Sequence, residues 1–283
     1  MSHRSCAFIL ALIAVFAAHS PAQSSTSADP VTLAQARITN YVSRLADLHC
    51  TEIVTQQKLN AKGHVDATEH SQFDYLIMMN GSNAEFQLNE SRIESPDAKH
   101  KLLPMPMLTT NGMTTVLLIF HPYYRDSYSF EQKPEEVIAG RTTVPIHFAH
   151  ISGRRSPAAL ALRGREYPLE LEGTAWLDKA SGDVIKVDAS LQRDMSDVGL
   201  RSLNIQVDYK NETVGKETLM LPLRAVVDVA TPRQHWRNTH AFEGYKSFST
   251  DAEQDPNYKL HVNPAEATPP GFTTPDEKEK EKQ

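Results

Sequence analysis

The stretch from Gly173 to Val229 constrains the fold of this chain more than any other feature. It contains four apolar runs in which inward and outward side chains alternate, and turn-forming residues separate each run from the next. In one run, Ile185, Val187 and Ala189 alternate with polar residues. A period of two is typical of half-buried β-strands, and short connections favour antiparallel neighbours. The stretch therefore predicts an antiparallel β-meander, and it contains no recognisable catalytic motif.

The first residues have the pattern of a secretory signal. His3 and Arg4 form a short basic start, and an apolar run of about a dozen residues follows. Small residues at the end of this run suit cleavage, so residues 1–22 are predicted to be a signal peptide and residues 23–29 a polar linker. The alternative is an uncleaved anchor. No later segment approaches the roughly 18 apolar residues of a spanning helix, so we expect a periplasmic or secreted protein without a transmembrane span after cleavage.

Charge and cysteine content narrow the function classes. Without Arg4 the mature chain has 28 basic residues against 35 acidic ones, a net charge of −7, which argues against nucleic acid as a partner. Cys50 is the single cysteine after the signal, so no intrachain disulfide can form. Residues 251–283 are rich in Pro, Glu and Lys and cannot bury enough apolar surface to order, so we predict a disordered tail. Residues 30–250 remain as one domain.

The rest of the chain predicts a helix, a hairpin and a short helical insert before the meander. Asp29 and Pro30 suit a helix start, and Asn80-Gly81 is a strong hairpin signal. The expected elements are a helix over 30–46, strands over 49–59, 73–80 and 84–88, a loop over 91–106, strands over 127–132 and 136–151, a loop over 153–161, and strands over 167–178 and 240–248. The segment 113–120 is compatible with a strand or a short helix, and the helix is favoured because Pro122 would end it.

This order of elements resembles the periplasmic lipoprotein-carrier superfamily (LolA/LolB-like), and it is closer still to secreted proteins of that shape from soil bacteria. The motifs that carry the resemblance are YVSRLADLHCTEIVTQQ at 41–57, GTAWLDKASGDVIKV at 173–187, and VDYK and LMLPL within 207–223. The resemblance implies an α+β fold: a single strongly curved antiparallel sheet, an open half-barrel, with covering helices on its concave face. In the carriers that face holds the acyl chains of lipoproteins.

A carrier of this kind needs a continuous apolar wall. Burial of one methylene contributes about 0.8 kcal/mol, so a chain of about fifteen needs a wall that contributes on the order of 12 kcal/mol. The alternative is that the covering helices bury the same side chains as ordinary core. The candidate ligand-binding residues are Tyr75, Ile77, Met79, Phe86, Leu117, Phe120, Trp176 and Ile185.

Metal and nucleophilic chemistry find no support in the pattern. His147 and His150 are three residues apart on an expected strand, which places them on opposite faces and is poor geometry for chelation. No G-x-S-x-G motif is present, and His49 and Cys50 point to opposite faces of their strand. We therefore expect no metal, no cofactor and no catalytic residue.

The leading hypothesis is a non-enzymatic envelope protein that binds a lipid, or the lipid of a lipoprotein partner, on the concave face of its sheet. The alternative is a protein-interaction or sensor module of the envelope on the same scaffold, without cargo. A third hypothesis, an enzyme of a type that no motif reveals, requires a cleft that holds a strongly perturbed histidine or carboxylate.

Overall fold

The computed structural model describes residues 29–45, 47–80, 87–94, 110, 112–113, 116–162 and 164–248. The predicted signal peptide, the predicted linker up to residue 28 and the predicted tail from 251 to 283 lie outside these residues.

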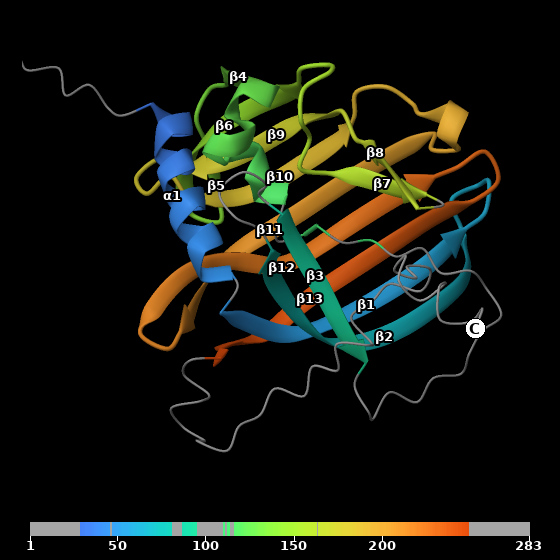
Figure 1. Ribbon diagram of the computed structural model, residues 1–283, viewed down its shortest axis with the longest axis horizontal. Helices are drawn as coiled ribbons and strands as arrows, with labels where there is room; N and C mark the ends of the chain where they lie inside the picture. Colours follow the sequence, from blue (N-terminus) through green and yellow to red (C-terminus); the bar gives the residue numbers. More distant parts are fainter. Residues whose placement is uncertain are drawn as a thin grey trace, which may run out of the picture.

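One large antiparallel sheet dominates the described chain (Figure 1). Its strand order is β3-β2-β1-β13-β12-β11-β10-β9-β6-β4, and β5 pairs with β6. The order ends in β3 and β4 without a pairing between them, so the sheet does not close into a barrel. Strands β7 and β8 form a separate two-stranded sheet. The strands are β1 (Leu48–Leu59), β2 (Val65–Asn80), β3 (Gln87–Glu94), β4 (Tyr128–Gln132), β5 (Glu136–Ile138), β6 (Arg141–His150), β7 (Ala159–Leu162), β8 (Arg165–Pro168), β9 (Leu171–Asp178), β10 (Val184–Leu191), β11 (Ser202–Val214), β12 (Glu217–Ala230) and β13 (His235–Ser247).

Helical elements pack against one face of this sheet, which we call the helix-covered face (Figure 1). They are α1 (Pro30–Leu45) and two short 3-10 helices, η1 (Val116–Phe120) and η2 (Pro122–Ser127); a further 3-10 turn, η3, spans Ser196–Val198. Asp29 caps α1, because its Oδ2 accepts hydrogen bonds from Thr32 N at 3.1 Å and Thr32 Oγ1 at 2.9 Å. The side chains that α1 buries at helical spacing are Val31, Ala34, Ile38, Tyr41, Val42 and Leu45.

The meander predicted between Gly173 and Val229 is confirmed. Strands β9 to β12 follow one another with antiparallel pairings throughout. The helix predicted over 30–46 is also confirmed, as α1, and the strand predicted over 49–59 is β1. These elements were predictable because their periods of two or 3.6 are carried by many consecutive residues.

Three predicted segments differ from the structure. Strand β3 spans Gln87–Glu94, so residues 91–94 of the segment predicted as a loop over 91–106 are a strand. Of the return strand predicted over 84–88, residues 87 and 88 belong to β3, and residues 84–86 lie outside the described residues. The strand predicted over 136–151 is two strands, β5 and β6, because Ala139 and Gly140 adopt positive φ values of 50° and 76° and form a turn. The hairpin β7–β8 was predicted as a loop and the start of the next strand.

Two glycines of the meander motif are required by close packing. A Cβ on Gly173 would lie 2.0 Å from the backbone oxygen of Asp188 on the neighbouring strand β10. A Cβ on Gly182 would lie 2.7 Å from the Cβ of Leu33 on α1, and Gly182 also has a φ of +76°. The first glycine therefore permits close strand approach, and the second permits the β9–β10 turn to pack under α1.

The opposite face of the sheet is more polar. On β11, the residues Asn204, Gln206 and Asp208 alternate with buried apolar residues.

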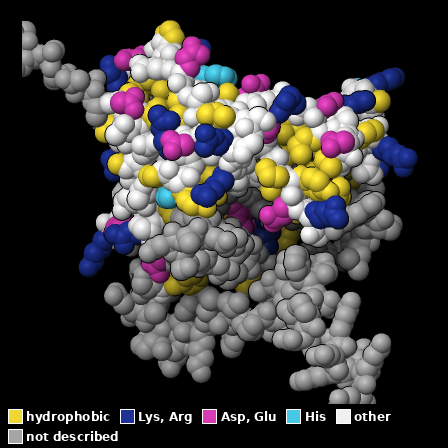
Figure 2. Space-filling model, turned by 45° about the horizontal axis from the view of Figure 1, so that its top comes forward, with side chains coloured by type: hydrophobic (Ala, Val, Ile, Leu, Met, Phe, Trp, Pro, Cys, Tyr) yellow, Lys and Arg dark blue, Asp and Glu magenta, His cyan; other side chains and the backbone are white. Residues whose placement is uncertain are grey.

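Figure 2 shows one face of the molecule on which basic and acidic side chains are interspersed with apolar ones. Among the described residues, no helix has the length and apolar character to cross a membrane.

Candidate functional site

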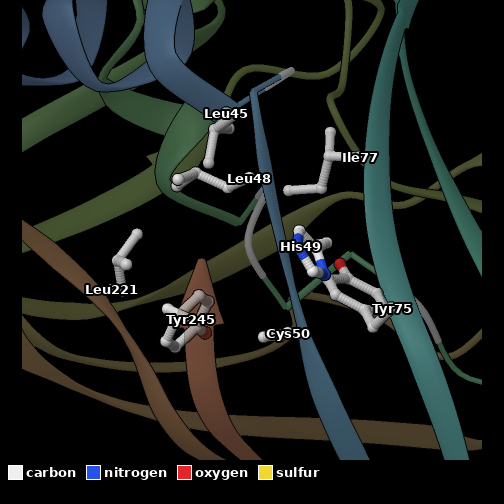
Figure 3. A pocket seen from close by; sticks show the side chains of 8 residues that line it. All are labelled: Leu45, Leu48, His49, Cys50, Tyr75, Ile77, Leu221 and Tyr245. Carbon is white, nitrogen blue, oxygen red and sulfur yellow. The ribbon is translucent and has the colours of Figure 1, made fainter. Parts of the chain in front are cut away.

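A small apolar cavity lies where the last turn of α1 meets strands β1, β2, β12 and β13 (Figure 3). Its volume is about 10 Å³, which is room for about one water molecule. Ligand sites for small molecules usually measure about 300–1,000 Å³, so side chains of the chain itself occupy most of this region. The cavity is lined by Leu45, Leu48, His49, Cys50, Tyr75, Ile77, Leu221 and Tyr245.

The period of strand β1 directs its alternate side chains to this cavity and to the region beside it. Leu48, Cys50, Glu52, Val54 and Gln56 are all buried, while the residues between them are partly exposed. Leu48, Cys50 and Val54 are ordinary residues for the buried positions of such a strand. Glu52 is not, because a carboxylate is almost never fully buried unless it is paired.

Glu52 belongs to a buried polar network, which we define as Glu52, Arg92, Thr110, Asn238 and His240. Arg92 Nε and Nη2 donate to the two carboxylate oxygens of Glu52, with 2.7 Å between Nη2 and Oε1. His240 Nδ1 lies 2.7 Å from the same Oε1. The side chains of Glu52 and His240 are 0% and 1% exposed, so this carboxylate is satisfied by protein donors in place of water.

Thr110 joins the network from outside the sheet. Its Oγ1 lies 2.7 Å from His240 Nε2 and accepts a hydrogen bond from Asn238 Nδ2 at 3.0 Å. Its carbonyl oxygen accepts from Arg92 Nη2 at 3.0 Å. An ionised carboxylate only accepts hydrogen bonds, so the Nδ1–H of His240 donates to Glu52, and in the neutral ring Nε2 accepts from the Thr110 hydroxyl. Carboxylate, imidazole and hydroxyl thus form one continuous chain.

The pKa values of the two buried ionisable groups on β1, Glu52 and Cys50, are shifted in opposite directions. Burial by itself would raise the pKa of Glu52, but the hydrogen bonds and charges of Arg92 and His240 outweigh it and hold this pKa below its ordinary value. Burial, with the neighbouring Glu52 carboxylate, raises the pKa of Cys50 to about 12. Glu52 is therefore a carboxylate and Cys50 a neutral thiol at physiological pH, and the thiol is a poor nucleophile.

The cavity and the polar network are contiguous through Tyr75. This side chain lines the cavity and is the cross-strand partner of Cys50. The guanidinium of Arg92 lies 5.5 Å from the centre of its ring, and the ring of Phe242 meets it edge-on at 5.5 Å. Phe242 in turn stacks beside His240, with ring centres 6.3 Å apart. One end of the helix-covered face thus carries an apolar part and a charged part side by side.

The predicted ligand-binding residues are dispersed in the structure. Tyr75 and Ile77 line the cavity together (Figure 3). Leu117 and Phe120 are buried in the main core on η1, where Phe120 packs against Phe130 and Phe148. Ile185 is buried at a register shift of β10. The side chain of Met79 and the whole of Phe86 lie outside the described residues.

Trp176 does not share a wall with Tyr75 and Ile77 in the structure. Its strand neighbours Ala175 and Leu177 are in the core, so Trp176 points to the other face of the sheet. There its Nε1–H donates to Glu136, and the ammonium of Lys186 lies 4.7 Å from the centre of its ring.

The polar network was missed by sequence reasoning. One signal for it was available: Glu52 occupies an inward position in the alternation of β1, between Cys50 and Val54. Its partners carried no comparable signal, since His240 is 188 positions away and Thr110 lies in no strand. Among the described residues, no group of three or more His, Cys, Asp or Glu side chains is arranged to hold a metal ion.

Comparison with known proteins gives similarity to solved structures only. No family model and no curated protein match the chain. Similar structures include a DUF1329 family protein from Desulfovibrio piger (11% identity, 79% of this chain, 94% of that chain, TM-score 0.42). Others are a LolA superfamily protein from Nitrosomonas europaea (13% identity, 77% and 91%, TM-score 0.37) and an outer membrane lipoprotein-sorting protein domain from Vibrio parahaemolyticus (10%, 80% and 95%, TM-score 0.40). One of these structures is described as a LolA superfamily protein.

Proposed function

We propose that this chain is a periplasmic or secreted envelope protein that binds a hydrophobic ligand, a lipid or the lipid of a lipoprotein, on the helix-covered face of its sheet. In this proposal that face is the concave face of an open half-barrel. The observation that carries the proposal is the contact between the apolar cavity and the buried polar network at Tyr75. An apolar surface beside a few fixed polar groups is the usual composition of a small-molecule site.

The cavity has to widen for an acyl chain to enter. Its walls come from different elements, with Leu45 at the end of α1 and Ile77 on β2, and these elements can separate without breaking a strand pairing. Each methylene that enters contributes about 0.8 kcal/mol. A ligand with several methylenes could therefore offset the loss of the contacts between α1 and β2.

Co-purified ligand and uptake of a fluorescent fatty acid test the proposal. We expect native mass spectrometry of the chain from a periplasmic preparation to show bound lipid. The variant Ile77→Trp fills the cavity and should lower fatty-acid uptake at least tenfold. Ile53→Trp is the matched control, because Ile53 lies on the opposite face of β1, and it should leave uptake unchanged. A chain without lipid and without uptake would overturn the proposal.

The second candidate is an interaction or sensor module of the envelope that has no cargo. The observation that favours it is the small volume of the cavity, about 10 Å³. Under this alternative, Ile77→Trp leaves binding to an envelope partner intact, and neither this variant nor the original chain takes up fatty acid. The same pair of variants therefore separates the two candidates.

A further inference from the structure

Three residues of the polar network have the connectivity of a nucleophilic catalytic triad. Glu52 and His240 Nδ1 are 2.7 Å apart, and His240 Nε2 and Thr110 Oγ1 are 2.7 Å apart. We propose that Thr110 is the nucleophile, His240 the general base and Glu52 the orienting carboxylate of a centre that hydrolyses carboxylic esters. This activity goes beyond the proposed binding function and does not depend on it.

The geometry meets the requirements for an activated hydroxyl. A nucleophile must lie within about 2.6–3.2 Å of its base, and a third group must orient that base. Both distances fall in this range. The hydrogen bond from His240 Nδ1–H to Glu52 fixes the ring tautomer, so that Nε2 is free to take the hydroxyl proton. The orienting carboxylate must itself be held in place, and the two hydrogen bonds that Arg92 donates to Glu52 do this.

Burial is graded along the triad. The side chains of Glu52 and His240 are 0% and 1% exposed, whereas Thr110 is only partly buried. The charge that develops on the imidazole is therefore stabilised by a carboxylate that water does not screen. Thr110, at the end of the chain, is the most exposed of the three residues. Asn238 Nδ2 donates to Thr110 Oγ1 at 3.0 Å, and in the proposal this neighbouring amide is the donor for the oxyanion.

The reaction follows from these positions. Thr110 Oγ1 bonds to the ester carbonyl carbon while its proton passes to His240 Nε2, and the tetrahedral oxyanion accepts a hydrogen bond from Asn238 Nδ2. The bond between this carbon and the alcohol oxygen breaks, and His240 returns the proton to that oxygen, so the alcohol leaves and an acyl-Thr110 remains. Water then attacks the acyl carbon while His240 Nε2 takes its proton. The bond between this carbon and Thr110 Oγ1 breaks, His240 returns the proton to Oγ1, and the carboxylic acid is released.

The surroundings of the triad favour an apolar acyl group. Phe242 stacks beside His240 and meets the ring of Tyr75 edge-on. Both rings are buried on the helix-covered face next to the network, so an acyl group that enters beside His240 would meet aromatic side chains. The substrate class that fits is an ester of an uncharged carboxylic acid.

A second threonine–histidine pair in the chain, which has no buried carboxylate beside it, is a control for Thr110 and His240. Thr55 Oγ1 lies 3.0 Å from His70 Nδ1 on the exposed face of β1 and β2. If any close hydroxyl–imidazole pair could react with esters, this one would react as well. The proposal requires that only Thr110 does.

The experiment treats the chain with p-nitrophenyl butyrate, follows p-nitrophenolate release, and maps the butyryl group by mass spectrometry after acid quenching. We expect a burst of release and a butyryl adduct on Thr110. Thr110→Val and His240→Gln should lower the rate at least about 100-fold. Thr110→Ser should keep an adduct at position 110, and Thr55→Val should behave as the original chain.

Two results would overturn the proposal. One is an original chain that releases p-nitrophenolate without an adduct on Thr110, or that releases none. The other is a folded Thr110→Val variant, with the urea midpoint of the original chain, that hydrolyses the ester at the original rate. Because the adduct is mapped on the original chain, the outcome is decided even if a variant fails to fold. Fatty-acid uptake is a separate measurement, so failure of the binding proposal stays distinguishable.

Discussion

Replacing Glu52 by Gln should destabilise the chain far more than the same change at an exposed ion pair. The Glu52 carboxylate accepts hydrogen bonds from Arg92 Nε, Arg92 Nη2 and His240 Nδ1, and its side chain is 0% exposed. A Gln side chain removes the charge and turns one acceptor into a donor that faces other donors. The guanidinium of Arg92, 14% exposed, would remain without its carboxylate.

The magnitude follows from burial. Removing one partner of a buried ion pair usually costs about 3–5 kcal/mol, because the other charge stays buried and uncompensated. The matched control is Glu217→Gln, which breaks a 2.8 Å pair with Arg44 whose side chains are 47% and 50% exposed. Such surface pairs contribute about 0–1 kcal/mol. The difference between the two variants should therefore be at least about 2 kcal/mol in the free energy of unfolding.

Urea unfolding followed by circular dichroism measures both variants, provided that the transitions remain two-state. A third variant, Glu52→Gln with Arg92→Met, should be less destabilised than the sum of the two single changes, since the second change removes the unpaired charge. The reasoning is refuted if Glu52→Gln costs no more than Glu217→Gln, or if the two network changes are additive.

Three further outcomes are expected. Gly173→Ala would place its Cβ 2.0 Å from Asp188 O, where about 3.3 Å is the normal approach, and should lower the free energy of unfolding in urea by more than about 3 kcal/mol. The control is Gly63→Ala, at a φ of +79° with no atom within 4 Å, which should lower it by only about 1–2 kcal/mol. Cys50, whose pKa burial raises to about 12, should react with a thiol reagent at pH 8 at least 100-fold more slowly in the folded chain than in urea; equal rates would contradict its burial. Arg92 and His240 lower the pKa of Glu52 in the folded chain, so the unfolded chain takes up a proton at this group first as pH falls. The stability from this group is therefore present above about pH 4.3 and is lost as pH falls below it. Below about pH 4.3 the Tm of Glu52→Gln should fall less steeply with pH than the Tm of the original chain, and equal slopes would refute the assignment.

Elements that extend over many residues were predictable from local periodicity alone. The meander β9–β12 and the helix α1 carry their pattern over whole elements, so a single atypical residue does not disturb it. The short strands were not predictable in this way. Strands β7 and β8 consist of small or mixed residues, and Leu160 and Tyr167 are their partly buried members. Two such positions define no period.

For Trp176, the alternation of inward and outward positions along β9 was a better guide to the direction of the side chain than its residue type. A large aromatic side chain suggests an interior position, yet the sequence around it places Ala175 and Leu177 on the inner face. Because successive side chains of a strand point to opposite faces, Trp176 had to point outward once its neighbours were inward. The outer position is made favourable by its contacts with Glu136 and Lys186.

The polar network depends on strand register, and register is what local sequence cannot supply. Strands β1 and β13 pair so that Glu52 faces Phe242 and Val54 faces His240. Glu52 and His240 are therefore diagonal neighbours on one face, close enough for long side chains to meet. A slip of one residue would move His240 to the outer face and leave Glu52 buried without its imidazole. Alternation alone could place Glu52 inward. Its partner His240 is 188 positions away in the sequence, so the pairing is determined only when β1 and β13 are aligned. The network that we propose to be reactive thus depends directly on that alignment.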